Sequence, residues 1–139
     1  IADPGAAVVS LAHQKGMQVI PLIGPSSILM AVMASGFNGQ SFAFNGYLDR
    51  DQDKRTSIIK FLENKAQKEL QTQVFMETPY RNEALFQDLL KVLNPNTKLS
   101  IACDLSLPSE YIKTRKMLEW KKENKPSLQK RPAIFSISA

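Results

Sequence analysis

The chain has 139 residues, of which 43% are hydrophobic and 22% charged, proportions that indicate a folded protein of one domain, or one domain with part of a neighbour. Its longest apolar stretch, residues 19–34, is interrupted by prolines, a glycine and serines, so we expect no membrane span, and the chain shows no secretory signal pattern. The formal net charge is +5, and the single cysteine, Cys103, excludes an internal disulfide and favours a reducing compartment, so we expect a cytoplasmic location.

The start of the chain predicts half of a strand–helix–strand unit. The spacing of apolar residues predicts a helix over residues 6–15 that Gly16 ends, and then a buried strand over residues 19–23. A helix that leads into a buried strand is half of a βαβ crossover, whose first strand should lie upstream of Ile1. We therefore expect the chain to be a fragment of a longer polypeptide.

The rest of the chain predicts an α/β domain. A helix is expected over residues 28–35, and the glycine- and asparagine-rich segment after it marks a boundary between residues 1–37, the end of a first domain, and residues 38–139, a second domain. In the second domain we expect strands near 42–47, 74–76, 99–103 and 132–138, and helices over 53–68, 81–93 and 110–122. Strands that alternate with helices of this length are typical of the α/β class.

A first candidate site follows the strand expected over residues 19–23. It consists of Gly24, Pro25, Ser26 and Ser27. A glycine after a strand lets a ligand approach the backbone, and a helix N-terminus favours anionic groups. The alternative is an ordinary helix start that a serine caps.

A second candidate site follows the strand expected over residues 74–76. Glu77, Tyr80 and Arg81 crowd this junction, which can place a carboxylate and a guanidinium beside a cleft at the carboxyl edge of a sheet. The alternative is a capping arrangement with a surface ion pair. Residues 102–110 form a similar junction after the next strand.

We expect no metal site. The segment Asp49–Asp53 superficially suggests a calcium loop, but Lys54 and Lys60 occupy its sixth and twelfth positions, where glycine and glutamate are required. These aspartates are better explained by a polar turn and a helix N-terminus. His13 has no cysteine or second histidine to complete a zinc set.

The positive charge is concentrated near the C-terminal end. Residues 113–131 contain eight basic and two acidic residues, a net charge of +6, so this segment holds the whole positive excess. Such a segment can attract phosphate-bearing partners. The alternative is a solvated helix face followed by a lysine-rich loop.

Four short motifs occur in an order that resembles the tetrapyrrole methylase superfamily, in particular its branch of ribosomal RNA small subunit methyltransferases that act on a cytidine ribose. The motifs are Ala2–Gly5, Ile23–Ser26, Gly46–Asp49 and Glu77–Arg81. The sequence departs from that branch where Ile23 replaces a proline, Tyr80 replaces a histidine, and Cys103-Asp104-Leu105-Ser106 stands in place of an Arg-Glu-Leu-Thr type segment. These departures leave a methyl donor plausible and put the acceptor in doubt.

The resemblance implies two α/β domains, the second with a mixed sheet flanked by helices, and S-adenosyl-L-methionine bound in the cleft between them. The donor contacts that it implies are Gly24, Pro25, Ser26 and Ser27, with Phe75 and Met76 near the adenosine and Pro132-Ala133 as further candidates. It also implies a homodimer.

The resemblance leaves the methyl acceptor open between a tetrapyrrole and a ribose hydroxyl of ribosomal RNA. In either case Glu77 is our candidate for positioning the acceptor or removing its proton, and Arg81 for orienting Glu77 or a phosphate. We expect the chain alone to be inactive, because most of the donor pocket would lie upstream. The competing hypothesis is a non-catalytic RNA-binding module that uses residues 113–131.

Overall fold

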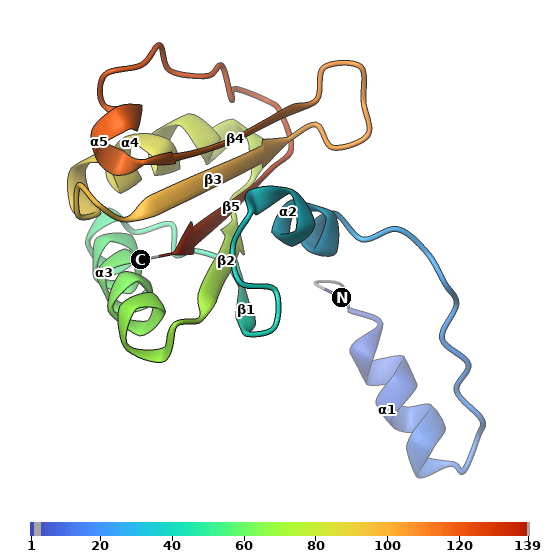
Figure 1. The fold of residues 1–139 in the computed structure, drawn as a ribbon. Helices are drawn as coiled ribbons and strands as arrows, with labels where there is room; N and C mark the ends of the chain where they lie inside the picture. The colour runs from blue at the N-terminus through green and yellow to red at the C-terminus, as the bar shows by residue number, and fades with distance from the viewer. Residues whose placement is uncertain (2–3, 139) are drawn as a thin grey trace.

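A five-stranded mixed sheet forms the centre of the protein in the computed structural model, which describes residue 1 and residues 4–138 (Figure 1). The strands are β1 (Phe42–Tyr47), β2 (Thr72–Met76), β3 (Lys98–Cys103), β4 (Tyr111–Lys116) and β5 (Ala133–Ser138), in the order β1-β2-β5-β3-β4. β1 pairs with β2 in parallel, and the other three pairs are antiparallel. The predicted α/β class with a mixed sheet is confirmed.

The pairing brings three strand ends to one edge of the sheet. β2 and β3 are both antiparallel to β5, so they run in the same direction, and β1 is parallel to β2. The carboxyl ends of β1, β2 and β3 therefore meet at the edge where β5 begins. Crevices at such edges are common ligand sites in α/β proteins.

Helices cover both faces of the sheet, as Figure 1 shows. On one face lie α3 (Gln52–Glu69), α4 (Asn82–Val92) and the short α5 (Met117–Trp120), and on the other lies α2 (Ser27–Ser35). A 3-10 turn, η1 (Pro79–Arg81), leads into α4. None of the helices in the described part of the chain is both long and apolar enough to span a membrane.

The two faces of the sheet carry separate cores. Phe75 and Phe135 belong to the main core under α3 and α4, whereas Val74 and Ile134 belong to a smaller core under α2. Neighbouring residues on a strand point to opposite faces, so each of these strands contributes to both cores. The same alternation decides which strand residues can reach a ligand on the α2 face.

The strand predicted over residues 19–23 is wrong. α1 (Ala6–Gln14) has no buried residue, and the segment after it has no regular structure and exposes its apolar side chains (Figure 1). A strand needs a neighbour to accept and donate its backbone hydrogen bonds, and none of the described strands pairs with this segment. Ala2 and Asp3 of the Ala2–Gly5 motif lie outside the described residues.

The helix predicted over residues 110–122 is also wrong, because its first half is β4 and only α5 is helical. β4 pairs with β3 along its whole length, from Cys103 opposite Tyr111 to Lys98 opposite Lys116. Tyr111, Ile112 and Thr114 are aromatic or β-branched residues that favour strands. Pairing with β3 prevails over the helical spacing that suggested one continuous helix.

The other predicted helices and strands are present with small shifts at their ends. Gly16 and Gly36 follow α1 and α2 in left-handed conformations, with φ of 66° and 74°, which confirms them as the ends of these helices. Ser26 occupies the N-cap position of α2 without a side-chain hydrogen bond, so the structure does not support the alternative of a serine-capped helix start. The domain boundary after residue 37 stays a prediction.

Candidate functional site

A cavity of about 270 Å³ lies at the edge of the sheet where β1, β2 and β3 end. Its walls are mostly apolar side chains from the strand ends and from the loop after β3: Tyr47, Met76, Pro79, Ala102, Leu105, Leu107, Pro132, Ala133 and Ile134. Ser27, at the start of α2, and two carboxylates, Glu77 and Asp104, complete the lining. A mostly apolar hollow with a few converging polar groups is the usual form of a small-molecule site.

Glu77 is the most distinctive group in the cavity. It directly follows β2 and is only 4% exposed. Its Oε1 accepts hydrogen bonds from the backbone N–H of Thr78 at 2.7 Å and from Nη2 of Arg81 at 2.5 Å. Its Oε2 is buried and has no hydrogen-bond partner among the described residues. An unpaired buried carboxylate oxygen is costly, so Oε2 is suited to a hydrogen-bond donor on a ligand.

Arg81, in the turn that follows, forms an ion pair with Glu77, which fits both the predicted junction and its alternative of a capping arrangement with an ion pair. The hydrogen bond from Arg81 to Glu77 raises the pKa of this guanidinium, so Arg81 stays charged. Arg81 itself does not line the cavity. Its role in orienting Glu77 or a phosphate stays a prediction.

Asp104 is a second carboxylate at the same edge. It directly follows β3, and its Oδ2 accepts hydrogen bonds from Nε of Arg131 at 2.7 Å and from Oγ of Ser109 at 2.8 Å. The hydrogen bond from Arg131, and then the one from Ser109, lower the pKa of Asp104 below the usual aspartate range. Its φ of 51° is left-handed, a backbone conformation that non-glycine residues adopt mainly where surrounding contacts enforce it.

The sequence identified the junction at residues 102–110 but assigned no role to Asp104. The signal was present, because Asp104 and Glu77 each come directly after a buried strand. Their proximity could not be inferred, because it depends on β2 and β3 running in the same direction on either side of β5.

Of the four residues predicted around the start of α2, only Ser27 lines the cavity. Gly24 and Pro25 belong to the exposed segment before the helix. A Cβ at Gly24 would meet no atom within 4 Å, so nothing in the described part of the chain requires a glycine there. The role of Gly24, Pro25 and Ser26 as donor contacts stays a prediction.

Phe75 and Met76 were predicted together, but the structure separates them. Met76 lines the cavity, whereas Phe75 lies in the main core on the other face of the sheet, with its ring centroid 6.1 Å from that of Phe135. The alternation of side chains along β2 allows only one of the two to face α2. Pro132 and Ala133, the further candidates, both line the cavity.

The basic segment is partly neutralised by its own neighbours. Lys113 and Arg115 both form ion pairs with Glu123, and Arg131 pairs with Asp104. The hydrogen bond from Lys113 is the main cause that lowers the pKa of Glu123, which keeps this acid charged. Three of the eight basic residues thus form ion pairs within the fold, which weakens the positive electrostatic field that a polyanion would meet.

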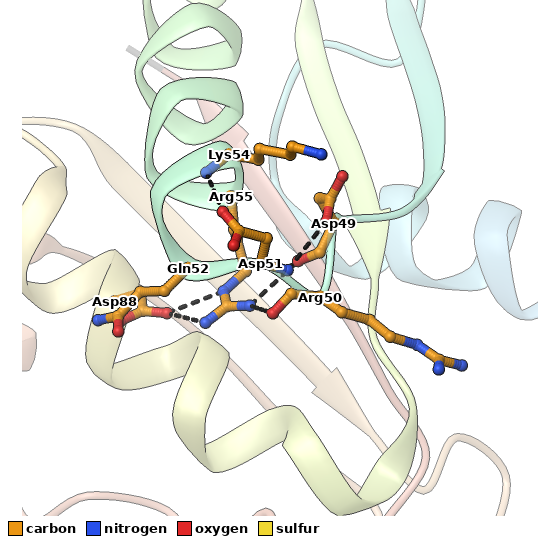
Figure 2. Close-up of polar contacts among 7 residues, drawn as sticks. All are labelled: Asp49, Arg50, Asp51, Gln52, Lys54, Arg55 and Asp88. Atoms are coloured by element: carbon orange, nitrogen blue, oxygen red, sulfur yellow. Dashed lines mark hydrogen bonds and ion pairs between the residues drawn. The ribbon is translucent and has the colours of Figure 1, made fainter.

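The aspartates of residues 49–53 form the predicted polar turn and helix start. Asp49 accepts a hydrogen bond from the backbone N–H of Asp51 at 2.9 Å, and Asp51 caps α3 by accepting from the N–H of Lys54 at 3.0 Å (Figure 2). Among the residues that the structure describes, no group of three or more histidine, cysteine, aspartate or glutamate side chains is placed to hold a metal ion.

No protein-family model matches the chain. Among curated proteins, it is 29% identical over 140 residues to "Ribosomal RNA small subunit methyltransferase I" of Buchnera aphidicola subsp. Schizaphis graminum, which covers 99% of this chain and 48% of the relative. The Vibrio cholerae protein of the same name is 34% identical over 119 residues, which covers 86% of this chain and 40% of the relative. The chain thus spans about half or less of the length of the curated relatives that it matches.

Solved structures agree in fold. The methyltransferase CobJ matches with a TM-score of 0.57 and 14% identity over 96% of this chain and 56% of CobJ. Uroporphyrin-III-C-methyltransferase from Thermus thermophilus matches with a TM-score of 0.52 and 18% identity over 98% of this chain and 58% of that protein. Together with the curated relatives, these matches confirm the predicted resemblance to the tetrapyrrole methylase superfamily.

Proposed function

We propose that this chain is one portion of an S-adenosylmethionine-dependent methyltransferase. It is homologous to part of ribosomal RNA small subunit methyltransferase I, and it has the tetrapyrrole methylase fold. The observation that carries the proposal is the cavity at the strand ends, which is lined by Glu77, a residue whose buried Oε2 has no hydrogen-bond partner among the described residues. The relatives are about twice as long as this chain, so the remainder of the donor pocket belongs to sequence outside it. A homodimer and a cytoplasmic location are parts of the same proposal.

We assign the cavity to the donor. Its apolar walls, including Met76 and Ala133, suit the flat faces of an adenine, and Ser27 at the start of α2 adds a polar group. Burial of apolar surface favours such a ligand by roughly 25 cal/mol per Å². Gly24, Pro25 and Ser26 complete the donor contacts in this proposal, because they lead directly into Ser27.

We assign the acceptor to ribosomal RNA. The curated relatives, at 29% and 34% identity, are named for ribosomal RNA. Uroporphyrin-III-C-methyltransferase from Thermus thermophilus matches at only 18% identity, a level that supports similarity of fold alone. A ribose hydroxyl must lose its proton as it is methylated, and Glu77 supplies a buried carboxylate oxygen for that purpose. A positioned base of this kind contributes roughly 10²–10⁴-fold to a rate.

The chemistry supplied by the donor is an in-line displacement, in which the acceptor oxygen bonds to the methyl carbon while the carbon–sulfur bond breaks and sulfur keeps the electron pair. The protein holds the two reactants in line, an effect that can lower the barrier by ~7–11 kcal/mol. In our proposal Glu77 takes the hydroxyl proton on Oε2, and Arg81 keeps the carboxylate oriented through Oε1.

A methyl-transfer assay tests the choice of acceptor. The intact polypeptide that contains this chain is incubated with methyl-labelled S-adenosylmethionine and, separately, with small-subunit ribosomal RNA and with a tetrapyrrole. We expect label in the RNA, at a ribose, and none in the tetrapyrrole. Label in the tetrapyrrole alone would overturn the RNA assignment and retain the methyltransferase, and label in neither would contradict both.

A further inference from the structure

Arg55 is a buried charge whose hydrogen bonds connect α4 to the loop between β1 and α3 (Figure 2). It lies in the first turns of α3, is 8% exposed, and donates from Nε and Nη2 to Oδ2 of Asp88 on α4 at 2.8 and 2.7 Å. Its Nη1 donates to the backbone carbonyls of Asp49 and Arg50 at 3.0 and 2.8 Å. All three of its nitrogens are therefore engaged, two with a carboxylate and one with the loop between β1 and α3.

Such an arrangement is not explained by stability alone. Burying two charges carries a desolvation penalty that their attraction often only balances, so a buried pair is weak evidence for added stability. Here the pair holds the conformation of the loop between β1 and α3. The guanidinium of Arg55 binds two successive carbonyls of this loop, while Asp88 fixes the guanidinium. The planar fork of arginine makes these contacts simultaneously, which a lysine cannot do.

The loop leads directly to the wall of the cavity. The pairing of β1 with β2 shifts register between Phe44 and Tyr47, and Gly46 there has a left-handed φ of 66°. A bulge of this kind redirects the side chain that follows it, so regular pairing does not set the direction of Tyr47, which lines the cavity. After the bulge, the N–H of Leu48 donates to the carbonyl of Met76 at 3.3 Å.

From these contacts we propose that Arg55 and Asp88 are positioning residues, which hold the loop after β1 so that Tyr47 forms one wall of the ligand cavity. Arg55 and Asp88 do not line the cavity themselves. Their effect passes through the carbonyls of Asp49 and Arg50 and the adjoining Leu48. The inference rests on the proposed donor site for its ligand, but the positioning of the loop can be measured without a ligand.

The same helix provides a matched control. Glu63 on α3 is also buried, and it fixes a different loop by accepting hydrogen bonds from the N–H and side-chain amide of Asn94, both at 2.8 Å, and from Oγ1 of Thr97 at 2.5 Å. None of these three residues lines the cavity. A change at Glu63 should therefore disturb a buried polar network of α3 without disturbing the cavity wall.

The experiment compares Arg55→Lys, Asp88→Asn and Glu63→Gln in the intact polypeptide. Residue-resolved amide hydrogen exchange of Leu48 and Asp51 reports on the loop, S-adenosylhomocysteine titration on the cavity, and thermal unfolding on general stability. We expect all three variants to unfold at lower temperature, but only the first two to speed exchange at Leu48 and Asp51. We also expect only these two to bind S-adenosylhomocysteine about 2- to 30-fold more weakly, the range for residues that act through others.

Equal exchange at Leu48 in Arg55→Lys and Glu63→Gln would overturn the positioning role, as would unchanged ligand affinity in a variant whose loop exchanges faster. If Arg55→Lys does not fold, Asp88→Asn, which keeps the shape of the side chain, decides the same comparison. If the unaltered protein does not bind S-adenosylhomocysteine, the proposed donor site fails, and the exchange rates alone decide whether Arg55 holds the loop.

Discussion

Replacing Glu77 by glutamine is expected to lower methyl transfer by the intact enzyme by roughly 10²–10⁴-fold, the contribution of a positioned base. Glutamine has nearly the same shape and can still accept the hydrogen bond from Arg81 at the position of Oε1. It cannot take a proton at the position of Oε2, the buried oxygen that has no hydrogen-bond partner among the described residues. Affinity for S-adenosylhomocysteine should stay nearly unchanged, because in our proposal the donor binds the apolar walls of the cavity and Glu77, although it lines the same cavity, serves the acceptor hydroxyl. Turnover is measured with RNA and labelled donor, and affinity by calorimetry.

The control for this variant is Glu83→Gln, a neutralised glutamate in the first turn of α4 that does not line the cavity. We expect it to keep both turnover and affinity. Unchanged turnover in Glu77→Gln would remove Glu77 from the mechanism. A large loss of S-adenosylhomocysteine binding in Glu77→Gln would instead make Glu77 a donor contact and contradict its role as a base.

Truncation of Trp120 to alanine is expected to lower the free energy of unfolding by about 3–5 kcal/mol, the usual cost of removing a large aromatic side chain from a core. Trp120 is 1% exposed, meets the ring of Phe86 edge-on with centroids 5.5 Å apart, and donates from Nε1 to the carbonyl of Leu99 at 3.0 Å. Its removal leaves both a cavity and a buried carbonyl without its partner. The chain has a single tryptophan, so unfolding is followed by circular dichroism rather than by fluorescence.

Phe61→Ala provides the comparison, because Phe61 is also aromatic but is 65% exposed on α3. Its effect should stay within about 0.5 kcal/mol, as for surface substitutions in general. A loss below about 1 kcal/mol for Trp120→Ala would contradict the packing described here, because even a partly collapsed core site exceeds that value.

Local patterns predicted the elements that carry their own signal. The helix that became α3 has most of its apolar residues on one face and an aspartate at its start, and the structure confirms both, with Phe61 as the exposed exception. β4 was missed because its residues also fit one face of a helix, and the pairing with β3 that makes it a strand involves a segment eight or more residues away. The apolar run at residues 19–23 is the opposite case. It has the composition of a strand, but it forms none because no described strand lies beside it to pair with.

The sequence predicted the site residues that directly follow strand ends. It missed those whose place in the site depends on the order and direction of the strands. Glu77 was predicted because it follows an apolar strand directly, and Met76 because the family resemblance implied it. Choosing Met76 over Phe75 required knowing which face of β2 meets α2. Arg55 and Asp88 are 33 residues apart on different helices, so no spacing in one sequence indicates their contact.

Titration of S-adenosylhomocysteine by calorimetry into the intact polypeptide and into this chain alone tests the claim that this chain contributes part of a donor pocket. We expect tight binding by the intact polypeptide and weak or no binding by the chain, because in our proposal the cavity forms only one side of the pocket. Absence of binding by a folded intact polypeptide would contradict the claim.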